Sequence, residues 1–217
     1  MGMLVLMNLL IAIVTDVWQA YDRQKIYIKA VNDEIREAVD FLRYYSNQIL
    51  EITNEKELEG PTGEKNTISY SPKGRFLCIS PWNFPVAILI GQISAALASG
   101  NKVIVKPSEH TSILGYLVVK RFHELGIPPE ALELIIGDGS YGEVLTQVDS
   151  LNGVAFTGSL ETAKKIQTNL LKNQKQIIPL IAETGGINAM IVDSSALLEQ
   201  VTDDVIRSAF DSAGQRC

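Results

Sequence analysis

Hydrophobic residues recur with helical spacing near the start of the chain. From Asn32 to Leu50, apolar side chains fall three and four residues apart, which predicts one amphipathic helix. The polar stretch from Glu51 to Lys65 contains two glycines and a proline and is predicted to be a loop. We therefore expect two units, an N-terminal helical segment with its linker (residues 1–65) and a second domain (residues 66–217).

Short apolar runs alternate with helical patterns from Thr67 onward. Strands are predicted at Phe76–Ile79, Val103–Val105, Leu132–Ile136, Gly153–Phe156, Ile177–Ile181 and Ala189–Val192. The clearest helices run from Thr111 to Leu125, from Ser159 onward, and from Leu197 to Ala213, the last with Val201, Val205, Ala209 and Phe210 facing inward. Apolar strands separated by amphipathic helices are typical of a parallel sheet covered on both faces. The predicted fold is therefore α/β, a Rossmann-like doubly wound sheet that binds its ligand at the carboxyl ends of the strands.

The composition excludes several classes of protein. With 46% hydrophobic and 20% charged residues among 217, the chain is globular rather than disordered or fibrous. A net charge of -6 without a basic cluster argues against a nucleic-acid partner. The two cysteines, Cys78 and Cys217, suit a reducing compartment. His110 and His123 lack companions at metal-ligand spacing, so no metal is expected.

The most apolar run, Met3 to Val14, raises the question of a membrane segment. A spanning helix needs about 20 apolar residues, so this run is too short. It also lacks the basic start and the small-residue cleavage site of a signal peptide. We expect a buried helix there, with a membrane anchor as the alternative, and a cytoplasmic protein with no spanning segment.

Three polar motifs have residue types that suit a nucleotide. Lys106-Pro107-Ser108-Glu109 follows a strand and offers a cation and a carboxylate to ribose hydroxyls, unless the two form a surface ion pair. Phe156-Thr157-Gly158-Ser159 opens a helix, where backbone N–H groups favour a phosphate, although a simple serine N-cap explains it equally well. The pattern G-x-G-x-x-G from Gly137 to Gly142 indicates a phosphate cradle or only a strand-to-helix turn.

Three further motifs carry groups that are used in catalysis. Pro81-Trp82-Asn83-Phe84-Pro85 holds an amide in a rigid turn, where it binds an oxyanion or bonds only to its own backbone. Glu183-Thr184-Gly185-Gly186 places a carboxylate beside two glycines, facing either a substrate or solvent. Cys217 follows Gly214-Gln215-Arg216, but a single cysteine by itself indicates little, and Cys78 within an apolar strand is expected to be core.

The order and spacing of these motifs resemble the aldehyde dehydrogenase superfamily. The resemblance is carried by Trp82-Asn83-Phe84-Pro85, Lys106-Pro107-Ser108-Glu109, Phe156-Thr157-Gly158-Ser159, Glu183-Thr184-Gly185-Gly186 and Gly214-Gln215-Arg216-Cys217, and it extends over roughly Asn32 to Cys217. The segments Arg36 to Tyr45, Glu183 to Ser195 and Ser212 to Cys217 are similar to the semialdehyde dehydrogenase part of bifunctional proline utilization A enzymes. Those enzymes pair this NAD-dependent activity with an FAD-dependent proline dehydrogenase.

The resemblance implies a role for each catalytic candidate. Cys217 would be the nucleophile that attacks the aldehyde of L-glutamate γ-semialdehyde and forms a thiohemiacetal. Asn83, together with the backbone N–H of Cys217, would hold the oxyanion. Hydride would pass to NAD and leave a thioester, and Glu183 would activate the water that releases glutamate.

The same resemblance implies NAD as the cofactor. Lys106 and Glu109 would hold the adenosine ribose, Ser159 the pyrophosphate, and Gly185 would lie near the nicotinamide. The expected cofactor-binding set is completed by Trp82, Ser108 and Gly158.

In this family a catalytic lobe normally follows the nucleophilic cysteine. Residues 66–217 would therefore be an NAD-binding lobe, and the chain as given is expected to be a fragment without useful activity. Full-length relatives are expected to be oligomers that act on a small-molecule aldehyde and carry a proline dehydrogenase half on the same polypeptide. The alternative is a non-catalytic nucleotide-binding or interaction module derived from such an enzyme.

Overall fold

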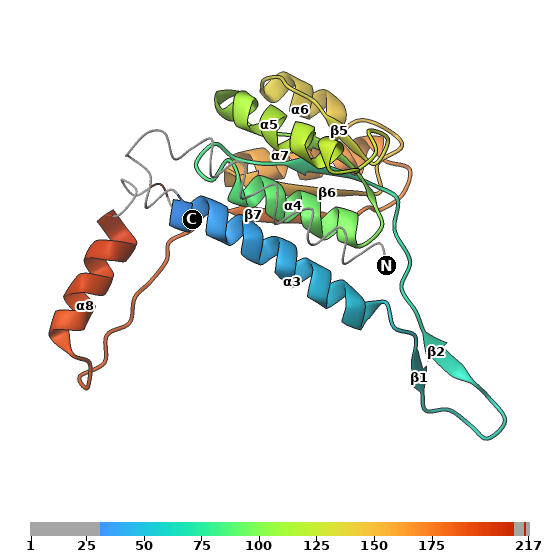
Figure 1. Cartoon of the computed structure of the whole chain (residues 1–217), viewed down its shortest axis with the longest axis horizontal. Helices are drawn as coiled ribbons and strands as arrows, with labels where there is room; N and C mark the ends of the chain where they lie inside the picture. The colour runs from blue at the N-terminus through green and yellow to red at the C-terminus, as the bar shows by residue number, and fades with distance from the viewer. Residues whose placement is uncertain (1–30, 211–214, 216–217) are drawn as a thin grey trace.

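The computed structural model describes residues 31–210 and Gln215 (Figure 1). The helix expected at Met3 to Val14 lies outside these described residues. Within them the chain forms a five-stranded parallel sheet, a two-stranded antiparallel hairpin and helices on both faces of the larger sheet. The prediction of a doubly wound α/β fold with an N-terminal helical segment is confirmed.

The parallel sheet has the strand order β5-β4-β3-β6-β7. Its members are β3 (Arg75–Ile79), β4 (Lys102–Lys106), β5 (Leu132–Leu134), β6 (Gly153–Gly158) and β7 (Leu180–Thr184). The chain builds outward from β3 to β5, then returns to the other side of β3 and adds β6 and β7. The strand order therefore reverses between β3 and β6, and in open α/β sheets the ligand binds beyond the carboxyl ends of the strands at such a point.

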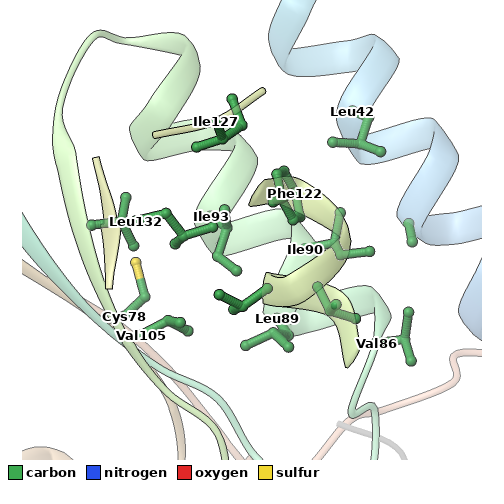
Figure 2. Close-up of a cluster of buried hydrophobic side chains, with 14 of the residues drawn as sticks. Leu42, Cys78, Val86, Leu89, Ile90, Ile93, Val105, Phe122, Ile127 and Leu132 are labelled. Carbon is green, nitrogen blue, oxygen red and sulfur yellow. The ribbon is translucent and has the colours of Figure 1, made fainter. Parts of the chain in front are cut away.

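Helices α4 (Ala87–Ala98) and α5 (Ser112–Glu124) cover one face of the sheet, and α3 (Glu37–Ile52) packs on α4. The core on this face contains large, fully buried side chains, among them Leu42, Leu89, Ile93, Phe122 and Leu132 (Figure 2). Burial of one such side chain contributes roughly 1.5–3 kcal/mol. Because α4 lies between the sheet and α3, it is apolar on nearly every side, and no amphipathic pattern marks it in the sequence.

Helices α6 (Gly139–Leu145) and α7 (Leu160–Asn173) cover the opposite face. The second core lies beneath them and includes Leu77, Ile104, Val154, Phe156 and Ile166. Successive residues of each strand face opposite cores, so the central strands are apolar throughout rather than alternating. This explains why continuous apolar runs predicted β3, β4 and β6 well.

The predicted helix from Asn32 to Leu50 is present, as the π-helical turn η1 (Val31–Arg36) followed by α3. The loop predicted from Glu51 to Lys65 is wrong in part, because it contains β1 (Lys56–Leu58). That strand pairs antiparallel with β2 (Asn66–Ile68), and Figure 1 shows the hairpin projecting from the sheet. Nearly every hairpin residue is exposed, so no alternation of apolar and polar positions reports these strands.

Two predictions near the carboxyl end are also wrong. The run Ala189–Val192 forms no strand, and its side chains are exposed. Helix α8 (Leu198–Val205) and the π-helical η3 (Ile206–Phe210) bury no side chain, so the expected inward placement of Val201, Val205, Ala209 and Phe210 is not found. Figure 1 shows α8 well apart from the sheet, so among the described residues its apolar face has no surface to pack on. The strand predicted at Ile177–Ile181 is present but begins at Leu180.

Across residues 31–210, no helix has the length and apolar character that a bilayer-spanning segment needs. Over the same residues, no three His, Cys, Asp or Glu side chains gather as the ligands of a metal ion would.

Candidate functional site

A cavity of about 730 Å³ opens at the carboxyl ends of β3 and β4, between α6 and α7. Its walls include Ile79, Lys106, Gly142, Thr146, Thr162, Ile166 and Asn169. Cofactor and small-molecule sites are typically concave and of about 300–1,000 Å³. The cavity therefore lies where the fold predicts a ligand and has a volume that accommodates one.

Lys106 is the buried cation of this cavity. It ends β4, is only 4% exposed, and its Nζ donates a long hydrogen bond of 3.4 Å to the Pro107 carbonyl oxygen. Burial lowers the pKa of Lys106, and the nearby carboxylates of Glu109 and Asp138 oppose that effect. An ammonium group has three donors, so Nζ retains the capacity to bind ligand oxygens.

Glu109 and Ser108 lie in the short 3-10 helix η2 (Glu109–Thr111) and at its start. Glu109 is exposed, and its carboxylate is close enough to raise the pKa of Lys106. Ser108 Oγ accepts a hydrogen bond of 3.4 Å from the His110 N–H, so this side chain caps the turn. The structure thus brings the predicted cation and carboxylate together at one strand end, with Ser108 shaping the loop between them.

The glycine pattern from Gly137 to Gly142 forms a strand-to-helix turn, with Asp138 as the N-cap of α6. Asp138 accepts hydrogen bonds from the N–H and the hydroxyl of Ser140, at 2.9 and 2.6 Å, and these lower its pKa. Its carboxylate occupies the position that a phosphate would need, so the turn interpretation of this pattern is the better one. Sequence reasoning missed Asp138, although an aspartate just before a helix is a recognisable cap signal.

Ser159 is the N-cap of α7, as the alternative interpretation of its motif predicted. Its Oγ accepts from the Thr162 N–H at 3.2 Å and donates to Thr162 Oγ1 at 2.9 Å. A Cβ at Gly158 would lie 2.6 Å from Phe156 Cζ, so the chain requires glycine there for packing. Because Thr162 also lines the cavity, the amino end of α7 opens onto it, and a pyrophosphate contact by Ser159 stays a prediction.

Asn83 connects the end of β3 to the far end of the chain. Its Nδ2 donates a hydrogen bond of 2.7 Å to the carbonyl oxygen of Gln215, 132 residues later. The amide is therefore not restricted to its own backbone, which was the alternative interpretation of this turn. Gln215 precedes Cys217 by two positions, but Cys217 itself lies outside the described residues. Trp82, beside Asn83, is 49% exposed.

Glu183 lies on β7, opposite Thr157 of β6 in the register of the sheet. Paired residues of neighbouring strands point to the same face, and Thr157 Oγ1 accepts a hydrogen bond from Gln92 of α4. Glu183 is therefore on the α4 face, the side from which the Asn83 turn continues into α4. Burial raises the pKa of Tyr45 most, followed by Tyr44 and then by the charge of Glu183. Because Tyr45 belongs to α3, this helix lies near the Glu183 carboxylate. Gly185 follows β7, and no described residue other than its chain neighbours lies within 4 Å of the place that a Cβ would take there.

Gln92 is a residue that sequence reasoning missed. Its Nε2 donates to the Ile79 carbonyl oxygen at 3.2 Å and to Thr157 Oγ1 at 3.1 Å, which ties β3 to β6 at the switch point. Its Oε1 is buried and has no hydrogen-bond partner in the part of the chain that the structure describes. A single amide within an otherwise apolar helix was the available signal.

The predicted residues thus form two groups, which meet along the carboxyl edge of β3 and β6. Lys106 and the start of α7 line the cavity, with Glu109 near Lys106, whereas Asn83 and Glu183 lie on the α4 side. An extended ligand such as a dinucleotide reaches from one group to the other in folds of this kind. The binding and catalytic roles of these side chains stay predictions.

Comparison with known proteins relates the chain to one protein family. The model of the "Aldehyde dehydrogenase family" matches residues 17–217. The chain is 51% identical over 189 residues to "Bifunctional protein PutA" of Escherichia coli, which covers 85% of the chain and 13% of that protein. It is 35% identical over 204 residues to "1-pyrroline-5-carboxylate dehydrogenase" of Oceanobacillus iheyensis, covering 92% of the chain and 39% of that protein.

Solved structures give the same picture. A mutant of Bradyrhizobium japonicum proline utilization A has a TM-score of 0.80 and 52% identity, over 84% of the chain and 19% of that protein. An aldehyde dehydrogenase of Brucella melitensis has a TM-score of 0.79 and 27% identity, over 85% of the chain and 38% of that protein. The chain therefore spans well under half of each of these relatives.

Proposed function

Since the chain belongs to the aldehyde dehydrogenase family, we propose that it is the NAD-binding part of an L-glutamate γ-semialdehyde dehydrogenase of proline catabolism. The observation that carries the proposal is the buried Lys106, which lines the cavity between α6 and α7. The sequence identity to "Bifunctional protein PutA" and to "1-pyrroline-5-carboxylate dehydrogenase" supports L-glutamate γ-semialdehyde over other aldehydes as the substrate. A proline dehydrogenase would act beside it, because the motifs of this chain resemble those of bifunctional proline utilization A enzymes.

The residues around the cavity fit NAD. A cavity of about 730 Å³ accommodates an adenosine, and Lys106 with Glu109 offers a donor and an acceptor to two ribose hydroxyls. A carboxylate at this place favours a free 2′-hydroxyl over a 2′-phosphate, because two negative charges repel. Thr162 and Ser159 would face the pyrophosphate at the amino end of α7. Bound there, NAD supplies the hydride acceptor that oxidation of an aldehyde requires.

The catalytic chemistry would belong to three side chains. The Cys217 sulfur would attack the aldehyde carbon, and the resulting oxyanion would accept a hydrogen bond from Asn83 Nδ2. Once the carbon is oxidised to a thioester, Glu183 would take a proton from water. That water would then add to the thioester carbon, release the carboxylate product and return the thiol.

Binding of the cofactor can be tested on the chain itself. Titration with NADH, followed by fluorescence, should give saturable binding. Replacing Lys106 by methionine should weaken that binding by about tenfold or more, because a charged hydrogen bond contributes roughly 1.5–3 kcal/mol. Lys120→Met on the exposed side of α5 is the matched control and should bind like the wild type. A folded chain that shows no saturable response refutes the proposal.

Turnover requires the rest of the enzyme. For this test the chain is joined to the segment that follows the matched region in the Oceanobacillus iheyensis protein, and we name this product the completed chain. It should reduce NAD in the presence of the semialdehyde, and Cys217→Ala should abolish that activity. NADH binding without turnover by the completed chain would favour the alternative, a non-catalytic nucleotide-binding module.

A further inference from the structure

Helix α4 begins without a capping side chain of its own. It follows the Pro81–Pro85 turn directly, its N-cap residue is Val86, and no side chain near it in sequence accepts from the first N–H groups. The first N–H groups of any helix lack partners within the helix, and valine is a poor N-cap. Val86 and Ala87 are only 4% and 0% exposed, so solvent does not satisfy their N–H groups either.

Glu34 supplies the missing cap from 52 residues upstream. Its Oε2 accepts hydrogen bonds from the N–H groups of Val86 at 3.0 Å and Ala87 at 2.8 Å. The carboxylate comes from η1, the π-helical turn that precedes α3, so it reaches α4 across the contact between these helices. A negative charge at the amino end of a helix is favoured by the helix dipole, and hydrogen bonds to a charged acceptor are the stronger kind.

The capped residues adjoin the turn that carries Asn83. This turn is held on its other side by the hydrogen bond from Asn83 Nδ2 to the Gln215 carbonyl oxygen, at 2.7 Å. We infer that Glu34 is a positioning residue, whose carboxylate fixes the amino end of α4 and thereby aims Asn83 at the oxyanion. The inference rests on the proposed function of Asn83. An oxyanion donor acts only if it is preorganised, so the atoms that hold its backbone contribute to the rate.

Amide hydrogen exchange tests the structural half of this inference on the chain as it exists. Glu34→Ala should speed exchange at Val86 and Ala87 by about tenfold or more, since both N–H groups lose a charged acceptor. Asp40→Ala, which removes an exposed carboxylate from α3, is the control and should leave both amides unchanged. If Glu34→Ala does not fold, Glu34→Gln retains an acceptor oxygen and should give a smaller increase at the same two amides. Unchanged exchange in the folded variant overturns the inference.

A double-mutant cycle on the completed chain tests the catalytic half. Removal of an oxyanion donor typically costs about 10²–10³ in kcat, so misaiming it through E34A should cost about tenfold, with the KM for NAD unchanged. In an Asn83→Ala background the same substitution should have almost no further effect on kcat, because the group it positions is gone. A full tenfold loss in that background would mean that Glu34 acts elsewhere and would overturn the inference. Absence of turnover in the completed wild-type chain counts against the proposed function alone, and amide exchange then decides the role of Glu34.

Discussion

Replacing Gly115 by alanine should disturb Lys106 and the cavity between α6 and α7. Gly115 is buried in α5, and a Cβ at this position would lie 2.5 Å from Cγ and 2.9 Å from Cβ of Pro107. Pro107 directly follows Lys106, the buried cation of the cavity. Carbon atoms in good contact are about 3.5–4.0 Å apart, so the proline ring must retreat by about 1 Å.

Two effects of opposite sign set the size of the change. Alanine in place of a helical glycine stabilises by about 1 kcal/mol, whereas overpacking of a buried contact costs about 1–3 kcal/mol. The expected net loss is up to about 2 kcal/mol in the free energy of unfolding, which lowers Tm by a few degrees at about 2–4 °C per kcal/mol. If Lys106 moves with the proline, the affinity for NADH should fall by about tenfold, which corresponds to the weakening of one hydrogen bond from a charged donor.

Thermal unfolding and NADH titration of Gly115→Ala measure both effects. Tyr116→Ala, an exposed position next to it on α5, is the control, and its stability should stay within about 0.5 kcal/mol of the wild type. A Gly115→Ala chain that is more stable than the wild type and binds NADH equally well would contradict this prediction. It would mean that Pro107 moves aside without carrying Lys106 with it.

Three other predictions follow from the same region and its core. Burial raises the pKa of the Cys78 thiol to about 12, so iodoacetamide should label a Cys217→Ser chain at mildly alkaline pH only after unfolding, as mass spectrometry can show; labelling of the folded chain contradicts this. Glu109→Gln should reduce the preference for NADH over NADPH, because a carboxylate that repels the 2′-phosphate is removed. An unchanged ratio of the two Kd values would exclude Glu109 as the residue that contacts the ribose. Burial lowers the pKa of Lys106, so between that lowered value and the ordinary 10.5 the unfolded chain binds the proton more tightly than the folded one. The free energy of unfolding of the wild type, relative to that of Lys106→Met, should therefore rise with pH through this window. Urea unfolding at several pH values measures this difference, and a difference that does not change with pH would disprove the prediction.

The positions of Lys106, Gly158 and Ser159 were predictable because these residues adjoin the strands that position them. Lys106 ends β4, and Gly158 and Ser159 end β6 and cap α7. For such residues, the position of an apolar run already indicates which edge of the sheet they occupy. The local sequence does not indicate that Lys106 is almost wholly buried, because its burial depends on the position of α6 beside it.

The contacts on the α4 side were not predictable, because they join residues far apart in the chain. The Asn83 amide reaches Gln215, the Gln92 amide ties β3 to β6, and Glu34 caps a helix that starts 52 residues later. A cap is normally sought within the first turn of its own helix, so nothing near Val86 indicates where its acceptor comes from.

The spacing of apolar residues was enough to predict the α/β class and the alternation of the central strands with helices, because it records which sides of each segment are buried. The strand order, the pairing of β1 with β2, and the exposure of α8 are visible only in the folded chain. An apolar pattern states that a segment has a face to bury, but burial also needs a partner surface. The central strands find one on both faces, whereas α8 and the run Ala189–Val192 find none among the described residues. The hairpin is the reverse case, since backbone hydrogen bonds alone pair its exposed strands and leave no trace in the pattern of hydrophobic positions.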